Sequence, residues 1–367
     1  MEKLYLDKEK TLVNLSNSIL KYFNIDTFHP SLKEADEILA KGNKKKVALV
    51  LFDGYGKNIF NIYKESTPFI ATHYKFDMLS VFPPTTVAAT TSLTTAKYPI
   101  ETAHLGWIQH FKKYNSEIVV FISNDKFDGS HFYYPHVQSD ILKPHYIWQL
   151  INESQKYNAT SISSYEVKTK AREDDMDAFF ERADDAILNH DFSYIYSSYP
   201  DHLLHLYGCS SEEVRKNIIF LERKLKELIS KHPDTLFLLI ADHGFKDCEE
   251  ISIREHKDFL ATLSKDYFLI EPTFAGFYVK DKANFEKLAK KYYGDKFLIY
   301  SKQELLDSHL LGYGEINPLT LDTLCDYFLI SISKYSFYDG DEPVGFKGVH
   351  AGGNKEEREI CLFAFND

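Results

Sequence analysis

The chain alternates short apolar runs with longer amphipathic segments, which is the pattern of a sheet covered by helices. The clearest apolar run, residues 47–52, is stopped by Asp53-Gly54 and contains no polar position. Such a run is typical of a strand buried on both faces of a parallel sheet. We predict further strands at residues 78–82, 118–123, 192–199, 235–241 and 359–365, and helices at residues 8–23, 32–40, 143–157, 173–190 and 212–231.

The pattern changes between residues 246 and 346. Residues 268–280 alternate between apolar and polar positions, as in strands with one exposed face. Further elements are predicted in this part of the chain: a helix at 281–294, a strand and helix start at 297–306, and a strand region at 324–338. We therefore expect residues 246–346 to form a small inserted α+β cap subdomain. The remainder, residues 1–245 and 347–367, is expected to form an α/β core with a central, mostly parallel sheet flanked by helices.

Composition limits the classes of protein to consider. A length of 367 residues and a hydrophobic content of 44% allow one large α/β domain with an insertion. The net charge of −11 argues against a broad nucleic-acid-binding surface. The four cysteines are far apart, which argues against a zinc ribbon or a disulfide scaffold and favours reduced thiols. Neither a signal peptide nor an apolar run of ~20 residues is evident, so we expect a cytoplasmic protein without membrane contact.

Acidic side chains stand where three of the predicted strands end. Asp53, Asp201 and Asp242 each closely follow such a strand. Because the carboxyl ends of parallel strands meet at one edge of the sheet, we expect these carboxylates to lie close together. Each of them alone also has a plain structural explanation, as a turn aspartate or a helix cap.

Three histidines accompany these carboxylates. His205 lies four residues after Asp201, so the two side chains share one face if Asp201 opens a helix. The alternative for this pair is a cap aspartate beside a surface histidine. His243 follows Asp242 directly, and His350 stands in a glycine-rich loop before the last strand. A set of carboxylates and imidazoles without thiolates is more typical of catalytic zinc or manganese than of structural zinc.

A hydroxyl-rich segment, residues 80–107, has the pattern of a loop that enters a helix. Pro83 and Pro84 precede Thr85 and Thr86, and a run of small and hydroxyl residues follows. A hydroxyl at a helix start suits nucleophilic chemistry, since the unpaired N–H groups favour an anion there. The alternative is a threonine cap on a buried helix.

Taken in order, five motifs resemble the alkaline phosphatase superfamily, in particular the type I phosphodiesterase/nucleotide pyrophosphatase family. They are FDGYG, FPPTTVAATTSLTTA, YPDHLLHLYG, ADHG and VHAGG, and the resemblance covers residues 47–365. It implies an alkaline phosphatase-like core and two divalent metal ions, zinc in the first place and manganese as the alternative. It also implies that Thr86, rather than Thr85, is the nucleophile.

The resemblance implies two ligand sets, which are carried over motif by motif. One metal is expected on Asp53, Thr86, Asp242 and His243, and the other on Asp201, His205 and His350. The sequence also departs from the family pattern. Vertebrate-type members carry an Asn soon after the nucleophile helix, and its nearest counterpart here is Trp107, with Gln109 beyond it. The sulfatase motif C-x-P-x-R is absent from the sequence.

The expected function is a metal-dependent hydrolase of phosphodiester or pyrophosphate bonds that forms a phosphothreonine at Thr86. A small-molecule phosphoester, with nucleotides among the candidates, is the expected partner; no nucleic acid or membrane is expected, and oligomeric state is not predicted. The alternatives are a phosphomonoesterase, phosphonate hydrolase or phosphomutase of the same superfamily, or an inactive metal-binding homologue. A plain nucleotide-binding protein is disfavoured, because neither a P-loop nor a G-x-G-x-x-G motif is present.

The scarcity of positively charged residues near the nucleophile in the sequence favours a diester substrate over a monoester. A monoester has an additional charged oxygen, which calls for a cationic clamp. No Arg stands near Thr86 in the sequence, and Lys97 is expected ~16 Å away along a continuous helix. A diester instead needs apolar contact for its second substituent, which we expect from the aromatic-rich loop Phe127–Pro135.

Overall fold

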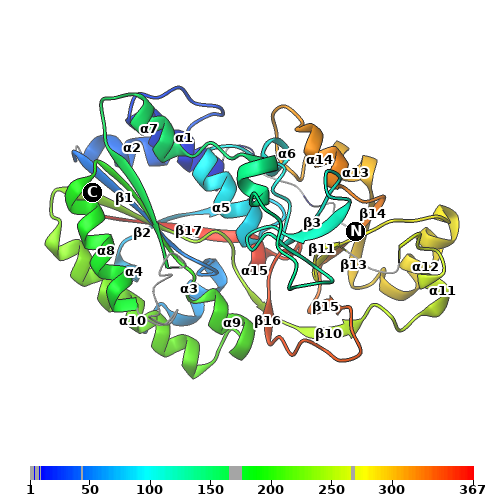
Figure 1. The fold of residues 1–367 in the computed structure, drawn as a ribbon. Helices are drawn as coiled ribbons and strands as arrows, with labels where there is room; N and C mark the ends of the chain where they lie inside the picture. The colour runs from blue at the N-terminus through cyan, green and yellow to red at the C-terminus, as the bar shows by residue number, and fades with distance from the viewer. Residues whose placement is uncertain (1–3, 5–7, 9, 43, 165–175, 266–268) are drawn as a thin grey trace.

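Strands from distant parts of the chain pair in a six-stranded sheet (Figure 1). This computed structural model describes residues 4, 8, 10–42, 44–164, 176–265 and 269–367. The strand order is β2-β17-β8-β1-β7-β6. The strands are β1 (Lys46–Phe52), β2 (Tyr74–Leu79), β6 (Ala159–Ser163), β7 (Phe192–Ser197), β8 (Thr235–Ile240) and β17 (Glu359–Phe365).

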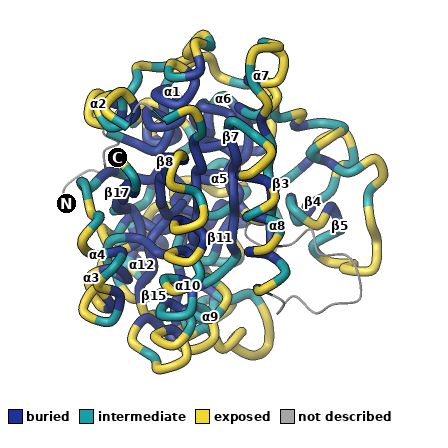
Figure 2. The backbone as a smooth tube through the Cα atoms, turned by 90° about the vertical axis from the view of Figure 1, so that its left-hand side faces the viewer, coloured by how far each residue is buried: buried dark blue, intermediate teal, exposed yellow. Residues whose placement is uncertain are grey.

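Four neighbouring strands of this sheet, β8, β1, β7 and β6, run parallel, and β17 is antiparallel to both β8 and β2. Every residue of β7 and β8 is buried, because helices cover both faces of the sheet (Figure 2). One face is covered by α1 (Leu12–Tyr22), α2 (Lys33–Gly42), α5 (Thr86–Thr95) and α7 (Ile147–Glu153). The other is covered by α3 (Lys57–Tyr63), α4 (Pro68–Thr72), α8 (Met176–Asn189) and α10 (Glu212–Lys231).

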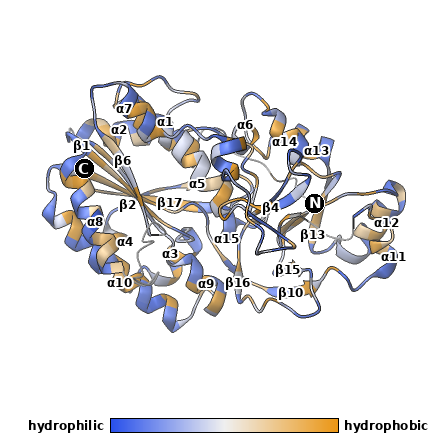
Figure 3. Ribbon diagram, viewed as in Figure 1, coloured by the Kyte–Doolittle hydropathy of each residue, from blue (hydrophilic) through white to orange (hydrophobic). Residues whose placement is uncertain are grey.

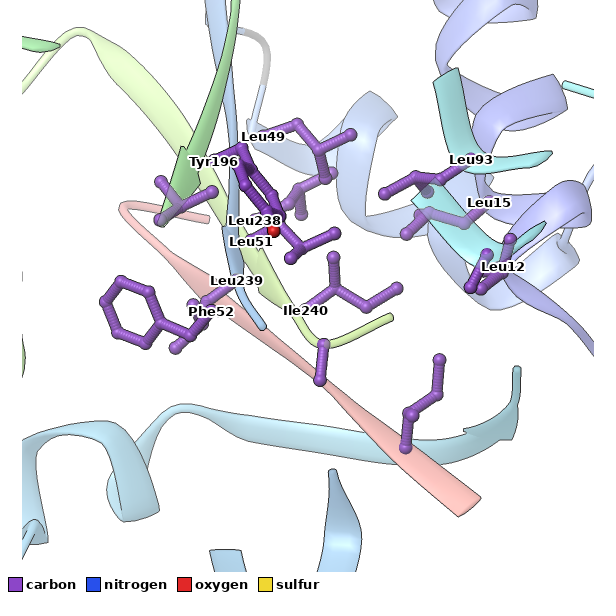
Figure 4. Packing of buried hydrophobic residues seen from close by; sticks show 14 of the residues in the cluster. Leu12, Leu15, Leu49, Leu51, Phe52, Leu93, Tyr196, Leu238, Leu239 and Ile240 are labelled. Carbon is purple, nitrogen blue, oxygen red and sulfur yellow. The ribbon is translucent and has the colours of Figure 1, made fainter. Parts of the chain in front are cut away.

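Branched and aromatic side chains of the central strands fill the space between sheet and helices. Leu49 and Leu51 of β1 pack beside Leu238 and Ile240 of β8, and α1 and α5 add their own leucines (Figure 4). The central strands are coloured apolar along their length, whereas α8 and α10 have hydrophilic outer sides (Figure 3). This packing fixes where β1, β7 and β8 end, and therefore where the residues that follow them lie.

A second sheet of seven strands lies beside the first, in the order β13-β14-β12-β11-β3-β4-β5. Its strands are β3 (Ile108–Phe111), β4 (Ser116–Val119), β5 (Asn124–Asp125), β11 (Leu269–Glu271), β12 (Phe274–Phe277), β13 (Phe297–Ser301) and β14 (Tyr327–Ser331). Three of them precede residue 246, and the junction is the pair Ile270 and Ile108. The division at residues 246 and 346 stays a prediction, but the sheet expected from that segment also takes in residues 108–125.

The expectation of an exposed strand face at residues 269–280 is wrong for β12; residue 268 lies outside the described residues. All four residues of β12 are buried. The reason is that Phe274 packs into the main apolar cluster, while Ala275 and Phe277 pack into a second cluster on the other side. The alternation of apolar and polar residues therefore does not indicate a solvent-exposed face at β12.

The remaining elements connect these sheets. Two small pairs are formed by β9 (Lys246–Asp247) with β16 (Gly348–Val349), and by β10 (Glu249–Ser252) with β15 (Tyr335–Tyr338). The other helices are α6 (Pro99–Thr102), the π-helix η1 (Gln138–Leu142), α9 (Asp201–Tyr207), α11 (Lys257–Leu260), α12 (Lys282–Tyr293), α13 (Lys302–Asp307), α14 (Pro318–Thr323) and α15 (Lys355–Arg358). Within the described residues, no helix combines the length and apolar character needed to cross a bilayer.

Several predicted elements agree with the structure to the residue, and others are displaced. The helix at 212–231 and the strand at 359–365 match α10 and β17. The strand expected at 78–82 is observed earlier, as β2, and β6 was not predicted. For the helix expected at 173–190, residues 173–175 lie outside the described part, and α8 covers the rest up to Asn189. None of the four cysteines forms a disulfide.

Two glycines let the loops after β1 and β8 approach each other, and this contact can be tested. A Cβ on Gly56 would lie 2.4 Å from the Cα of Gly244, and one on Gly244 would lie 2.0 Å from the Glu356 carbonyl oxygen. We expect Gly244→Ala to lower the free energy of unfolding by about 2–3 kcal/mol, measured by urea denaturation. Gly340→Ala is the control, since its nearest neighbour lies 3.6 Å away. Equal stability of the two variants would contradict this account.

Candidate active site

Helix α5 begins at Thr86 and is held by buried polar groups of α1. Thr85 is its N-cap residue, with extended backbone angles of φ −137° and ψ 150°. At the other end, Asn17 donates to the Ala96 carbonyl at 3.0 Å and Ser16 donates to the Leu93 carbonyl. Because the last carbonyls of a helix have no partners within it, these bonds fix α5 along its axis. The hydroxyl of Thr86 is thereby placed at a rigid helix start.

Backbone hydrogen bonds join the loops that follow the three central strands. The Asp53 N–H donates to the Ser197 carbonyl at 3.0 Å, and the Asp201 N–H donates to the Asp53 carbonyl at 3.0 Å. The Asp242 Oδ1 accepts the N–H of Gly54 at 3.1 Å and that of His243 at 3.0 Å. Gly54 has a φ of +74°, a conformation that glycine adopts without strain. The structure therefore brings all three predicted carboxylates to one edge of the sheet.

Thr86 lies beside the first predicted group of side chains. Its Oγ1 is 3.4 Å from the Asp53 Oδ2 and 3.3 Å from the His243 Nε2. The same His243 Nε2 lies 3.2 Å from the Asp53 Oδ1 and 3.4 Å from the Asp242 Oδ2. Asp53, Asp242 and His243 are almost wholly buried. These four residues thus converge as the resemblance led us to expect.

The second predicted group converges on a single carboxylate oxygen. The Asp201 Oδ1 is 3.7 Å from the Nε2 of His205 and 3.7 Å from the Nε2 of His350. It is also 4.0 Å from the His243 Nε2, so it lies between the two groups. Among the described residues, ligand atoms near enough to share one cation occur in two sets: Asp201, His205 and His350, and Asp53, Asp201 and His243. Asp201 belongs to both sets, whereas the resemblance implies a place in one set alone.

Each of the three histidines turns the same nitrogen toward the site. The Nδ1 of His205 contacts the Gly348 carbonyl at 3.0 Å, and the Nδ1 of His243 contacts the Gly244 carbonyl at 3.1 Å. The Nδ1 of His350 contacts the Pro84 carbonyl at 3.3 Å. A carbonyl only accepts, so each Nδ1 must carry the hydrogen. The Nε2 of each ring is therefore the atom that faces the site.

The charged forms of the three carboxyls, and of the His205 and His350 imidazoles, are disfavoured in this environment. Burial, in the first place, raises the pKa of Asp53 to about 7 and that of Asp242 to about 8, and the second shift is increased by the charge of Asp53. Burial and the two neighbouring carboxylates also raise the pKa of Asp201 well above its usual value. Burial lowers the pKa of His205 to about 4 and lowers the pKa of His350 well below its usual value.

This set of donors fits divalent cations. The Oδ1 of Asp201 and the Oδ2 of Asp242 are buried without a hydrogen-bond partner, although carboxylate oxygens normally find one. Separations of 3.2–4.0 Å between these atoms are near the about 3.4 Å edge expected for tetrahedral ligands at 2.0–2.1 Å from zinc. The ligand assignments themselves remain predictions.

Two side chains near this site were missed from the sequence. Tyr196, on β7, donates its hydroxyl hydrogen to the Asp53 Oδ2. Glu271, at the end of β11, accepts hydrogen bonds from the Thr85 hydroxyl at 2.6 Å and from the Trp107 N–H at 2.8 Å. Neither had a local signal: Tyr196 reads as an ordinary strand residue, and Glu271 lies in the segment expected to be peripheral. Gln109 is hydrogen-bonded to backbone groups of residues 103–106 and does not reach the cavity wall.

A cavity of about 1490 Å³ opens over these residues. The loop Phe127–Pro135 was expected to line it and does not. Aromatic wall residues come from elsewhere instead: Trp107, Phe121, Tyr146, Trp148, Tyr194 and Phe346. Lys143 is the only Lys or Arg among the described residues that line the cavity. Lys97 lies against the ring of Phe28 and is not among them.

Comparison with known proteins adds a family and several structural neighbours. The sequence model of the Type I phosphodiesterase / nucleotide pyrophosphatase family matches residues 47–310. No curated protein matches the chain. Murine ectonucleotide pyrophosphatase / phosphodiesterase 5 is 15% identical, with a TM-score of 0.63 over 87% of each chain. The human protein of that name is 17% identical, with a TM-score of 0.62 over the same shares.

A bacterial enzyme has a similar fold. Phosphonoacetate hydrolase from Sinorhizobium meliloti 1021, solved with phosphonoformate, is 14% identical with a TM-score of 0.66, over 87% of this chain and 89% of that chain. The murine protein has also been solved as an inactive threonine-to-alanine variant in complex with AMP. At these identities the likeness shows the fold, and it confirms the expected alkaline phosphatase-like α/β architecture with a central, mostly parallel sheet.

The raised pKa values predict how metal removal changes stability with pH. Asp53 and Asp242 have a higher pKa in the folded chain than the about 3.9 of an unfolded Asp, so protonation favours folding. That contribution is complete below about pH 4 and is lost as pH rises through about 7 and 8. Between pH 6.5 and 8.5 we expect the Tm of chelator-treated protein to fall by several degrees, and zinc to reduce that fall.

The two histidines with lowered pKa do not disturb this window, because their contribution is lost only as pH falls below about 6.5. Burial also raises the pKa of Glu271 to about 7, which acts in the same direction as the aspartates. Differential scanning calorimetry with and without zinc measures the effect. Superimposable curves for stripped and zinc-treated protein across this window would contradict a cation site at these carboxyls.

Proposed function

The chain belongs to the type I phosphodiesterase / nucleotide pyrophosphatase family, and from this premise we propose that it hydrolyses phosphodiester or pyrophosphate bonds with Thr86 as nucleophile. The observation that carries the proposal is the position of the Thr86 Oγ1. It stands at the start of α5, 3.3 Å from the His243 Nε2 and 3.4 Å from the Asp53 carboxylate. Family membership supports a phosphoester hydrolase. The bond type and the nucleophile are our proposal.

In this proposal Thr86 attacks phosphorus in line, its Oγ1 forms the new P–O bond, and the bond to the leaving oxygen breaks. Water then hydrolyses the phosphothreonine. N–H groups in the first turn of α5 have no partner within the helix and are available to a phosphoryl oxygen. A neighbour that is inactive as a threonine-to-alanine variant supports a threonine nucleophile.

Two divalent cations are proposed to be held by Asp53, Thr86, Asp242 and His243, and by Asp201, His205 and His350. Bound there, they would supply positive charge that favours the ionised Thr86 hydroxyl and offsets charge on the leaving oxygen. Three clustered carboxyls and three imidazole Nε2 atoms support this assignment. Burial raises the pKa of Asp242 and Asp201, and neighbouring carboxylates raise both further. Tyr196 holds the Asp53 carboxylate in place through its hydrogen bond. We propose zinc, with manganese as the alternative.

The cavity favours a substrate with a bulky apolar or aromatic substituent. Trp107 and Phe121 make an edge-to-face pair with centroids 6.3 Å apart, and Trp148 stacks on Tyr146 and Tyr194 at 4.4 and 5.7 Å. All five residues line the cavity. Such walls accommodate a substituent that contains a nucleobase or an aryl ring. The AMP bound by the murine neighbour contains a nucleobase.

Phosphonate hydrolysis is the second candidate, because a phosphonoacetate hydrolase shares the fold. Phosphonoacetate has a carboxylate in addition to its phosphonate, and a second anion calls for a further cationic partner. Lys143 is the only described Lys or Arg on the cavity wall, and its side chain is exposed. This composition favours the diester, which has a single charge.

Substrate preference tests the proposal. We expect bis(p-nitrophenyl) phosphate or a thymidine nitrophenyl phosphodiester to be cleaved with a kcat/KM about tenfold or more above that of p-nitrophenyl phosphate, because the cavity offers aromatic contact and little positive charge. Assays with zinc or manganese measure both values under one condition. A preference for the monoester would indicate a phosphatase, and turnover of phosphonoacetate alone would indicate a phosphonate hydrolase.

Replacement of the nucleophile gives a second test. Thr86→Ala is expected to lower kcat by about 10³-fold or more, because it removes the attacking oxygen. Thr86→Ser retains an oxygen and should keep part of the activity. Thr85→Ala is the matched control and should lose less than about tenfold, since it removes only the hydrogen bond to Glu271. Equal losses at Thr85 and Thr86, with folded variants, would contradict the assignment.

A further inference from the structure

Glu271 is a buried carboxyl on the cavity wall that the proposed reaction does not use. It ends β11, the residue is only 7% exposed, and it lines the cavity together with Thr85 and Thr86. It comes from the segment expected to form a cap, whereas the groups proposed to act in the reaction come from other parts of the chain. A carboxyl in a largely buried position needs a structural or a chemical reason.

One oxygen of Glu271 ties β11 to the nucleophile region. Its Oε1 accepts the Thr85 hydroxyl hydrogen at 2.6 Å and the Trp107 N–H at 2.8 Å. Gly106 allows β11 to come this close, because a Cβ there would lie 2.4 Å from the Ile270 side chain and 3.4 Å from the Glu271 Oε1. The neighbour of Thr86 along the chain is therefore fixed to a carboxyl group.

The other oxygen, Oε2, has no hydrogen-bond partner among the described residues. Within the described residues the hydrogen bonds of Glu271 are both made by Oε1, and no ion pair with a Lys or Arg is found. Burial raises the pKa of Glu271 to about 7, while the bonds from Thr85 and Trp107 and the nearby His243 act to lower it. The Asp201 carboxyl experiences the negative charge of Glu271 across the cavity. Glu271 thus places a carboxylate on the cavity wall that Thr85 and Thr86 also line.

We propose that Glu271 is a specificity-determining residue that disfavours a doubly charged phosphoryl group at Thr86 and so selects phosphodiesters over phosphomonoesters. This inference rests on the proposed function and deepens it. A monoester has a second ionisation with a pKa near 6 and therefore has about two negative charges in alkaline solution, whereas a diester has one. Like charges in a site of low dielectric repel more strongly than they do in water.

The test compares Glu271→Gln with the wild type at pH 8.5. Glutamine has the same shape and its Oε1 can still accept from Thr85 and Trp107, but it lacks the charge. We expect the ratio of diester to monoester kcat/KM to fall about tenfold, chiefly because monoester kcat/KM rises. Metal content should stay unchanged, which elemental analysis of the same samples checks.

A binding measurement separates charge from turnover. The sequence contains two tryptophans, Trp107 and Trp148, and both line the cavity, so intrinsic fluorescence reports its occupancy. Inorganic phosphate, a dianion at pH 8.5, should bind zinc-loaded Glu271→Gln about tenfold more tightly than wild type. Thr85→Val is the control for structure, because it breaks the bond to Glu271 and leaves the charge in place.

The outcomes separate cleanly. An unchanged diester-to-monoester ratio and unchanged phosphate affinity in Glu271→Gln would overturn the inference, as would an identical shift in Thr85→Val. A wild-type enzyme that cleaves no phosphoester overturns the proposed function instead, and the phosphate titration still decides whether the Glu271 charge excludes a dianion.

Discussion

The structure depends on three carboxyl groups, two of them fully buried, that follow three adjacent parallel strands. Parallel pairing of β8, β1 and β7 places Asp242, Asp53 and Asp201 at the same edge, and burial makes ionisation of the group unfavourable. Three imidazoles whose Nδ1 atoms contact backbone carbonyls turn their Nε2 atoms toward this edge. A bound cation would supply the positive charge that stabilises these carboxylates. Metal binding at the proposed site would therefore also stabilise the fold.

Helix α5 meets the same edge under a second constraint. Val87 to Thr95 are all buried, so packing surrounds the helix and restricts its movement. Buried Ser16 and Asn17 of α1 bind carbonyls near its end, and Thr85 at its start is held by Glu271. The position of the Thr86 hydroxyl is thus set from both ends of α5 by segments far away in the sequence. Rigid placement of this kind is what a nucleophile in an in-line reaction requires.

Much of the site could be predicted because its signals are local. A hydrophobic run followed by Asp53 or Asp242 fixes both the strand and the edge at which the side chain emerges, and Asp201 with His205 has helical spacing. Tyr196 could not be found in this way, since its role depends on a partner on another strand. Glu271 and the pairing of β3 with β11 depend on tertiary contacts between distant segments, which periodicity does not encode.

The first sheet positions the groups proposed to react, and the second sheet contributes to the cavity wall that contacts the rest of the substrate. Groups proposed to act on phosphorus follow strands of the first sheet or begin α5, where parallel register and buried packing leave little freedom. Walls that meet the rest of the substrate come partly from the second sheet, through Ile270 and Glu271, and partly from the segment around Trp107. Because Glu271 binds Thr85 directly, the second sheet is coupled to the nucleophile through a single carboxyl. A change in that sheet can therefore alter which phosphoryl group is accepted while the strand ends, and the cations they are proposed to hold, stay in place.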